Sequence, residues 1–229
     1  MISCIVLAGG KGTRMGSETK KQYLELLGKP ALSWSLLAFQ NSMVDEIILV
    51  CSDEDREFCK EEIIEKYDIN KCRKFVEGGA ERYLSVYNGL KEVSGEYVMI
   101  HDGARPCITP DTINKAGEML LSTGTCCVGT FVSDTIAVLG EDGTICNLPD
   151  RKTLWSSQTP QCFKTEEIIG SYDKALAAGE NKITDDDFVA FKYGNAKIHV
   201  LDDGPDNIKL TTKKDILLAE GILKAQMRI

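Results

Sequence analysis

The segment VLAGGKGTRMG, residues 6–16, places four glycines and two cations directly after an apolar run. Glycines at such a turn let backbone N–H groups approach phosphate oxygens without an intervening side chain. Four basic residues, Lys11, Arg14, Lys20 and Lys21, bring positive charge to the same stretch. These residue types predict a loop that binds a phosphorylated ligand.

Two common phosphate-binding patterns do not fit this loop. The dinucleotide pattern G-x-G-x-x-G fits Gly10 and Gly12, but its third position is Met15 and the next glycine comes one place late, at Gly16. In that pattern an acidic residue follows at the end of the next strand, about 20 positions after the glycines. Here the next predicted strand ends at roughly twice that separation. The P-loop pattern G-x-x-x-x-G-K-[ST] is not matched either. The spacing disfavours a nicotinamide oxidoreductase and indicates a loop that folds over its ligand.

The charge balance limits the kinds of partner. The 229 residues include 27 basic and 35 acidic side chains, for a formal net charge of −8. So acidic a protein is a poor candidate for binding nucleic acid or an anionic membrane. A polyanionic small ligand must therefore meet a local cluster of cations, and we expect neither a nucleic-acid nor a membrane partner.

The cysteines indicate a reducing compartment. Nine cysteines form no C-x-x-C pair, and only two histidines are present, so a structural zinc site is not expected. The odd count, the spacing and the missing signal peptide favour the cytoplasm over a disulfide scaffold. No apolar run approaches the roughly 20 residues that a membrane span needs. We expect a soluble cytoplasmic protein.

Apolar runs alternate with helical patterns along the chain. This alternation predicts an α/β protein, a Rossmann-like three-layer αβα fold with a mostly parallel central sheet, in one domain over residues 1–229. Helix caps are expected at Thr109, followed by Pro110, and at Thr212 with Asp215. The main strands are expected at 2–8, 46–51, 96–100, 126–132 and 197–201, and helices at 30–40 and 53–67.

Residues 133–155 break this alternation. Asp142-Gly143 lies between two alternating stretches, which is typical of a β-hairpin. A two-stranded hairpin is barely stable alone in water. The hairpin should therefore lie on the parent domain, or project as an arm that pairs with a second subunit.

Sequence blocks along nearly the whole chain resemble one family of nucleotidyltransferases. The N-terminal block LAGGKGTRMG…KKQYLELLGKP resembles the enzymes that activate sugars and polyols, and most closely the 2-C-methyl-D-erythritol 4-phosphate cytidylyltransferase family of the non-mevalonate isoprenoid route. Further blocks agree in order: EGGAERYLSVYNGL (77–90), HDGARP (101–106), DT (134–135), DRKTLWSSQTPQCF (150–163), TDD (184–186) and DNIKLTT (206–212).

The resemblance implies transfer of a cytidylyl group from CTP to 2-C-methyl-D-erythritol 4-phosphate, giving the CDP-polyol and pyrophosphate. The nucleophile would be a phosphate monoester oxygen, which is mostly ionised at neutral pH because its second pKa is about 6. No general base is then needed. Catalysis should rest on positioning and on charge neutralisation by cations and a divalent metal, expected to be Mg²⁺.

The resemblance also implies which residues carry the reaction. Arg14, Lys21 and Lys209 would be the catalytic cations. Lys20 stands where the family usually has a proline, and the adjacent Gln22 sets the register on Lys21. The base-reading contacts would be the Gly79 backbone and the Ser85 hydroxyl. The full set of nucleotide-binding residues would be Ala8, Gly9, Gly10, Gly12, Gly79, Ser85 and Asp102.

The polyol phosphate would be held by Arg105, Thr135, Arg151 and Thr184, because a guanidinium matches phosphate oxygens bidentately. In the resembled family the hairpin is an arm exchanged between subunits. Thr135 and Arg151 would then serve the neighbour's site in a homodimer built through the 133–155 arm, and a monomer should be inactive.

Asp102 directly follows a predicted strand, at the edge where parallel sheets bind ligands. Mg²⁺ prefers one or two carboxylates together with phosphate oxygens. We therefore expect Asp102 to bind the metal, with Asp206 as a weaker second ligand. The acidic run at 184–187 is interpreted instead as a solvated helix start.

Three alternatives stay open. A ribitol 5-phosphate cytidylyltransferase would share fold and chemistry, although Arg151 with Leu154-Trp155 favours the erythritol branch. A sugar 1-phosphate nucleotidyltransferase would use another base. A catalytically silent nucleotide-binding regulator has less need for the combination of Arg14, Lys21, Asp102 and Lys209, which argues against it.

Overall fold

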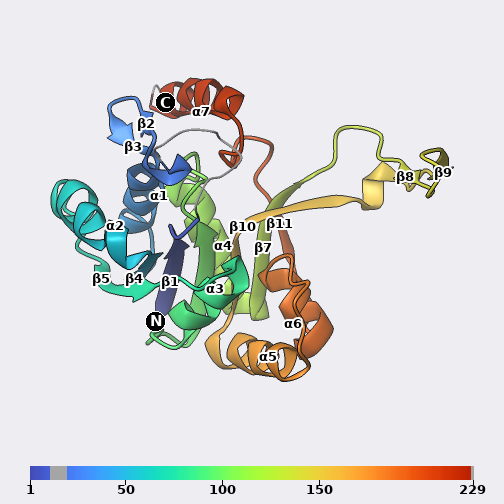
Figure 1. Cartoon of the computed structure of the whole chain (residues 1–229), viewed down its shortest axis with the longest axis horizontal. Coiled ribbons are helices and arrows are strands. Elements are labelled where there is room, and N and C mark those ends of the chain that lie inside the picture. Colours follow the sequence, from blue (N-terminus) through green and yellow to red (C-terminus); the bar gives the residue numbers. More distant parts are fainter. Residues whose placement is uncertain (11–19, 228–229) are drawn as a thin grey trace.

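A seven-stranded sheet forms the centre of the computed structural model, which describes residues 1–10 and 20–227. Its strand order is β11-β7-β10-β6-β1-β4-β5 (Figure 1). The strands are β1 (Ile2–Leu7), β4 (Glu46–Cys51), β5 (Cys72–Glu77), β6 (Tyr97–Asp102), β7 (Thr125–Phe131), β10 (Trp155–Lys164) and β11 (Val200–Asp202).

Most of the strand pairs are parallel, as predicted. β1 pairs in parallel with β4 and β6, β4 with β5, and β11 with β7. β10 is antiparallel to both of its neighbours, β6 and β7, and the sequence pattern did not predict it as a strand. The strand expected at 197–201 is shorter and begins at Val200.

Helices cover both faces of the sheet, which confirms the three-layer prediction. On one face Cys4 and Val6 belong to a buried cluster with α1 (Ala31–Gln40), η3 (Cys59–Glu65) and α4 (Pro110–Thr123). On the other face Ile5 lies among buried residues of α3 (Arg82–Leu90), α5 (Thr165–Ala177) and α6 (Asp186–Gly194). Side chains alternate across a strand, so consecutive residues of β1 serve opposite layers.

The helix expected at 53–67 is present but changes its winding. It runs as α2 (Asp53–Phe58) and continues as η3, which is a π-helix. The two predicted caps are confirmed: the Thr109 hydroxyl accepts a hydrogen bond from the Thr112 N–H at 3.1 Å, and Thr212 with Asp215 forms a capping box. Local hydrogen bonds of this kind depend on residues three apart, so the sequence predicts them well.

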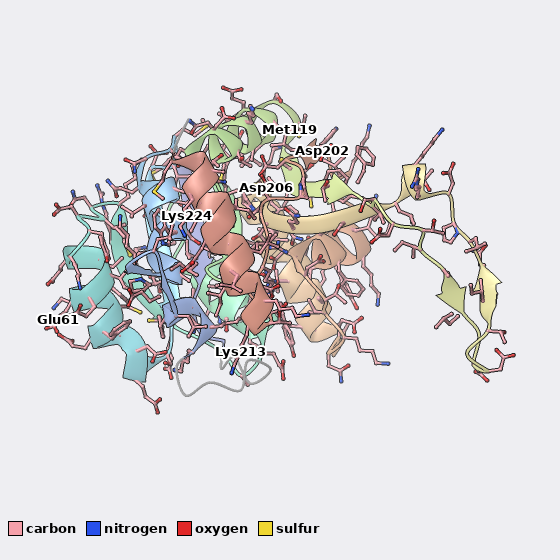
Figure 2. The ribbon with its side chains drawn as sticks, turned by 90° about the horizontal axis from the view of Figure 1, so that it is seen from above. Glu61, Met119, Asp202, Asp206, Lys213 and Lys224 are labelled. Atoms are coloured by element: carbon pink, nitrogen blue, oxygen red, sulfur yellow. The ribbon has the colours of Figure 1, made fainter. Side chains whose placement is uncertain are left out.

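The C-terminal helix α7 (Lys213–Gln226) covers a small separate cluster. Leu26 of β2 (Glu25–Leu26) packs there against Ala219 and Leu223 of α7, next to β3 (Lys29–Pro30). Figure 2 shows α7, which carries Lys213 and Lys224, lying across the body of the molecule. This packing brings the segment just before α7 back to the site edge of the sheet.

The predicted hairpin is present and projects from the body. β8 (Val138–Leu139) pairs antiparallel with β9 (Ile145–Asn147), and Gly143 of the turn has φ 79°, which favours glycine. Both views show this arm extending away from the sheet (Figures 1 and 2). Its apolar side chains are exposed, with Leu139 at 62% and Ile145 at 61%.

All nine cysteines are free, and Cys4, Cys51 and Cys126 are buried in strands as the pattern predicted. No helix within residues 1–10 and 20–227 has the length and apolar character needed to cross a membrane.

Candidate active site

The glycine turn after β1 is fixed by a buried amide. The Gln22 side chain is 2% exposed and donates hydrogen bonds to the carbonyls of Ala8 (2.5 Å) and Gly10 (3.0 Å). Gln22 lies in the short helix η2 (Lys21–Tyr23), so this contact also places Lys21 beside the turn. Two expected site residues of the turn, Gly12 and Arg14, lie outside the described residues.

A second turn, after β5, lies against the first one. A Cβ built on Gly9 would be 3.9 Å from the Gly78 Cα. The Gly79 N–H donates to the Ser85 hydroxyl at 2.9 Å, and a Cβ on Gly79 would meet the Leu84 carbonyl carbon at 2.9 Å. Only glycine fits this close approach. The structure therefore brings together the two turns that should hold the nucleotide, while their reading of the base stays a prediction.

Asp102 ends β6 between two cations. Its Oδ1 accepts a hydrogen bond from Arg82 Nε at 2.9 Å, and its Oδ2 accepts one from Lys209 Nζ at 2.5 Å. Burial alone would raise the pKa of Asp102, but Arg82 and Lys209 outweigh it and hold the pKa well below the ordinary range. Lys209 thus reaches the end of β6 from 107 residues away, as the prediction of a shared site requires.

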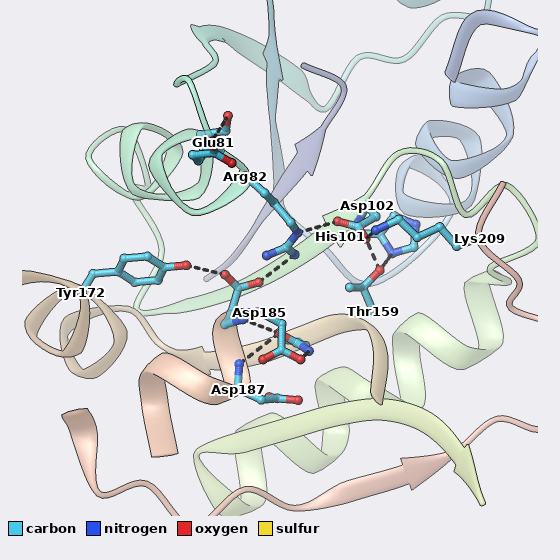
Figure 3. Close-up of polar contacts among 12 residues, drawn as sticks. Glu81, Arg82, His101, Asp102, Thr159, Tyr172, Asp185, Asp187 and Lys209 are labelled. Atoms are coloured by element: carbon cyan, nitrogen blue, oxygen red, sulfur yellow. Dashed lines mark hydrogen bonds and ion pairs between the residues drawn. The ribbon is translucent and has the colours of Figure 1, made fainter. Parts of the chain in front are cut away.

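Arg82 continues this network toward α6 (Figure 3). Its Nη2 donates to Asp186 Oδ2 at 2.9 Å, while the other oxygen of Asp186 accepts a hydrogen bond from the Tyr172 hydroxyl at 2.6 Å. Asp186 and Tyr172 are both fully buried. A chain of polar contacts therefore runs from α5 through α6 and α3 to Lys209.

His101 precedes Asp102 and faces the other side of β6. Its Nδ1 lies 3.0 Å from the Thr159 hydroxyl, which also accepts a hydrogen bond from the Asp102 N–H at 3.1 Å. Burial lowers the pKa of His101 to about 4, so the imidazole is neutral at pH 7. Held inside the sheet, it is not placed to act as a general base on a ligand.

Arg105 follows β6 and holds the segment that carries Lys209. Its Nη1 donates to the Asn207 carbonyl at 2.7 Å, and the Asn207 side chain donates to the Thr159 carbonyl at 2.8 Å. Among the described residues, Arg105 Nε is buried without a hydrogen-bond partner. Arg105 thus lies at the predicted edge, and its contact with a substrate phosphate remains a prediction.

Two of the remaining predicted substrate contacts lie on the arm, apart from this cluster. Thr135 and Arg151 are exposed on the projecting arm, where Arg151 Nη1 donates to the Ser133 carbonyl at 3.1 Å. Thr184 is exposed just before α6. The structure does not bring the arm residues to Asp102 of the same chain.

The metal prediction has a narrow donor set. Among the described residues, no group of three or more His, Cys, Asp or Glu side chains is placed to hold a metal ion. Asp206 is exposed. Its neighbours Asn207 and Lys209, which contact Arg105 and Asp102, connect this segment to the network. Each Asp102 oxygen carries one cation, which leaves lone pairs for a further ligand. The set fits Mg²⁺ only if phosphate oxygens supply most of its shell.

The interpretation of residues 184–187 as a solvated helix start needs a correction. Asp185 does cap α6, since its Oδ1 accepts a hydrogen bond from the Phe188 N–H at 2.9 Å. Asp186, however, is fully buried and pairs with Arg82, and burial raises the pKa of Asp187 to about 7. Arg82, Asp186 and Tyr172 are the network members that sequence reasoning missed. The sequence indications were two blocks, EGGAERYLSVYNGL, which contains Arg82, and TDD, which contains Asp186.

Fold and site together define an α/β nucleotidyltransferase: a mostly parallel sheet, glycine turns at its edge, and cations gathered around one carboxylate. The family model described as 2-C-methyl-D-erythritol 4-phosphate cytidylyltransferase matches residues 2–225. The chain belongs to this family.

Individual relatives agree with this assignment. The chain is 45% identical to the 2-C-methyl-D-erythritol 4-phosphate cytidylyltransferase of Lachnospira eligens over 98% of its length and 100% of the relative. It is 41% identical to that of Lachnoclostridium phytofermentans, over 97% of the chain and 96% of the relative. Among solved structures it is similar to 4-diphosphocytidyl-2C-methyl-D-erythritol synthase from Anaerococcus prevotii, with a TM-score of 0.87, 32% identity and coverage of 97% and 96% of the two chains.

Proposed function

We propose that this protein transfers the cytidylyl group of CTP to 2-C-methyl-D-erythritol 4-phosphate and releases pyrophosphate, a step of isoprenoid precursor synthesis. Membership of the family supports the substrates. The observation that carries the chemistry is the meeting of Lys209, Arg82 and Asp102 at the end of β6, beside the glycine turns. A ribitol phosphate acceptor is not favoured by these relatives.

The reaction forms one bond and breaks one. An oxygen of the acceptor phosphate attacks the α-phosphorus of CTP, and the bond from this phosphorus to the oxygen that bridges to the β-phosphate breaks. Pyrophosphate leaves with the electron pair. The attacking oxygen is already ionised because its pKa is about 6, so no side chain has to remove a proton. The buried, neutral His101 is consistent with a reaction that needs no general base.

The cations would neutralise the charge that accumulates around the α-phosphorus. Lys209 contacts Asp102 at the end of β6, Lys21 is the neighbour of Gln22, which holds the glycine turn, and Arg14 belongs to the same proposal. Preorganised donors cost no reorganisation at the moment of reaction, so loss of one should lower kcat about a hundredfold. Gly79 and Ser85 would read the base, and Arg105 would hold the acceptor phosphate.

Magnesium is part of the proposal. Asp102, with Asp206 as a weaker second, would hold it together with the triphosphate oxygens. When bound, the ion would neutralise phosphate charge and favour departure of pyrophosphate. Arg82 and Lys209 keep Asp102 ionised and oriented for this contact.

A homodimer through the 133–155 arm completes the proposal, with Thr135 and Arg151 serving the partner's site. Its support is the exposed apolar surface of the arm, which includes Val138, Leu139 and Ile145. Exposed apolar patches of this kind are usually covered by a partner. A cytoplasmic location is proposed on the same footing, from the free cysteines.

The test is pyrophosphate release with each of the four common nucleoside triphosphates, against 2-C-methyl-D-erythritol 4-phosphate and against ribitol 5-phosphate. Rapid release only with CTP and the methylerythritol substrate is expected, and Lys209→Ala should lose most of it. Release with ribitol 5-phosphate alone would replace the proposed acceptor. No turnover with any pair would favour a nucleotide-binding regulator.

A further inference from the structure

Among the described residues, Arg82 is the one side chain that forms ion pairs with two buried carboxylates of different elements. It begins α3, directly after the turn of Gly78 and Gly79, and contacts Asp102 at the end of β6 and Asp186 at the start of α6. The planar guanidinium presents separate nitrogens to the two acids, which a point charge cannot do. Arg82 therefore lies on the side of Asp102 opposite to Lys209 (Figure 3).

Its far partner is rigidly held. The carboxylate of Asp186 is fully buried and accepts a hydrogen bond from the Tyr172 hydroxyl. The backbone N–H of Asp186 donates to Gln161 Oε1 at 2.9 Å. Gln161 also accepts the N–H of Asp187 at 3.1 Å, so β10 fixes the start of α6. Arg82 is thus anchored on the side away from the site.

The second partner of Arg82, Asp102, has to release Lys209 if the proposed function is correct. Lys209 forms an ion pair with Asp102. A lysine that stabilises a triphosphate must give up at least part of that contact. Before any metal ion binds, an ion pair of Lys209 and Asp102 alone would resist this, because its loss would leave a buried carboxylate without a counter-ion. Arg82, on the other oxygen of Asp102, remains when Lys209 moves.

We propose that Arg82 is a positioning residue that acts through Lys209: it is the resident counter-ion of Asp102 and lets Lys209 exchange this carboxylate for a phosphate oxygen of the substrate. The inference rests on the proposed function for its role in turnover. Its structural part, the coupling of Arg82 to Lys209 in anion binding, does not.

The variants at Arg82 and Asp186 are chosen so that no buried charge is left alone while Lys209 is present. Asp186→Asn serves as the reference background, because the amide oxygen can still accept from Arg82 while the amide nitrogen donates to the Tyr172 hydroxyl oxygen. In that background, Arg82→Met removes the cation at similar length, and Arg82→Lys keeps a cation beside Asp102. Thermal unfolding checks that each variant folds.

Two measurements are made on each variant, kcat with CTP and 2-C-methyl-D-erythritol 4-phosphate, and the Kd of inorganic tripolyphosphate. We expect R82M/D186N to lose about 10- to 100-fold in kcat relative to D186N, with KM for the acceptor changed much less, and R82K/D186N to recover part of the loss. Tripolyphosphate should bind more weakly to R82M/D186N.

Lys209→Ala, added to D186N and to R82M/D186N, completes a double-mutant cycle. The effects of Arg82 and Lys209 on tripolyphosphate binding should be strongly non-additive, since the former acts through the latter. Additive effects, a wild-type protein that does not bind tripolyphosphate, or equal losses in the Met and Lys variants would overturn the inference. If wild-type protein binds with this coupling but does not turn over CTP, the proposed function fails and the role of Arg82 stands.

Discussion

The ammonium of Lys20 lies 2.5 Å from Oδ2 of Asp55, and this ion pair fastens the residue before Lys21 to the first turn of α2. The same oxygen accepts the Tyr23 hydroxyl at 3.1 Å. The residues on both sides of Lys21 and Gln22 are therefore tied to Asp55. Lys20 has φ −61°, close to the value that a proline ring imposes.

The ion pair thus does with a side chain what the proline usual in the family does with its ring. We expect Lys20→Pro to keep kcat within about twofold, because the backbone already has a compatible φ. Lys20→Ala should lower kcat about tenfold, because Lys21 loses its fixed approach. Equal losses in both variants, measured by pyrophosphate release, would show that the charge of Lys20 matters and its geometry does not.

The arm prediction can be tested by mixing two inactive variants. Arg151→Ala removes an arm residue, and Lys209→Ala removes a residue of the body. If each arm serves the partner's site, one site of every mixed dimer contains neither change. Unfolding and refolding an equimolar mixture should then restore about a quarter of wild-type activity. Recovery no greater than the sum of the separate variants would place Arg151 in the site of its own chain.

Asp187 should make the protein less stable as the pH rises. Burial raises the pKa of Asp187 to about 7 in the folded state. The free energy lost by ionising a buried carboxyl is therefore absent below the pKa of the unfolded chain, and it grows until the pH reaches the pKa of the folded protein. Asp187→Asn should therefore raise the free energy of unfolding, and more at about pH 7.5 than at about pH 5. Urea unfolding at both pH values measures this, and a gain that does not depend on pH would contradict it.

His101 should act in the opposite direction. Its pKa is lowered to about 4, so the unfolded chain binds the proton first and stability falls as the pH drops from about 6.5 toward 4. With the compensating Asp187 removed, in D187N, the free energy of unfolding should fall by about 2 kcal/mol between pH 7 and 5. His101→Asn in the same background should abolish most of that fall. A slope that survives the replacement would assign it to another group.

The parts of the fold that depend on local pattern were predictable. Parallel strands buried on both faces produce apolar runs such as residues 46–51, which are fully buried in β4. β10 was missed because its sequence, WSSQTPQCFK, is largely polar and contains a proline. Its place in the sheet depends on antiparallel pairing with β6 and β7, which are distant in sequence.

The site was predictable only where a motif marks a residue. Lys209 and Asp102, which were both expected in one site, form an ion pair. The contact of Arg82 with Asp186 joins residues 104 positions apart, and nothing in the acidic run at 184–187 tells which carboxylate is buried. A charge pair across such a distance is decided by how α3 and α6 pack on the sheet, which no local pattern encodes.

The most direct test of the central claim identifies the product. Wild-type protein is incubated with CTP, 2-C-methyl-D-erythritol 4-phosphate and Mg²⁺, and the phosphorus NMR spectrum is followed with time. The proposed transfer predicts pyrophosphate and a CDP-polyol, with two coupled phosphorus signals, in equal amounts. Consumption of CTP without a new diphosphate linkage to the polyol, or no consumption at all, would contradict it.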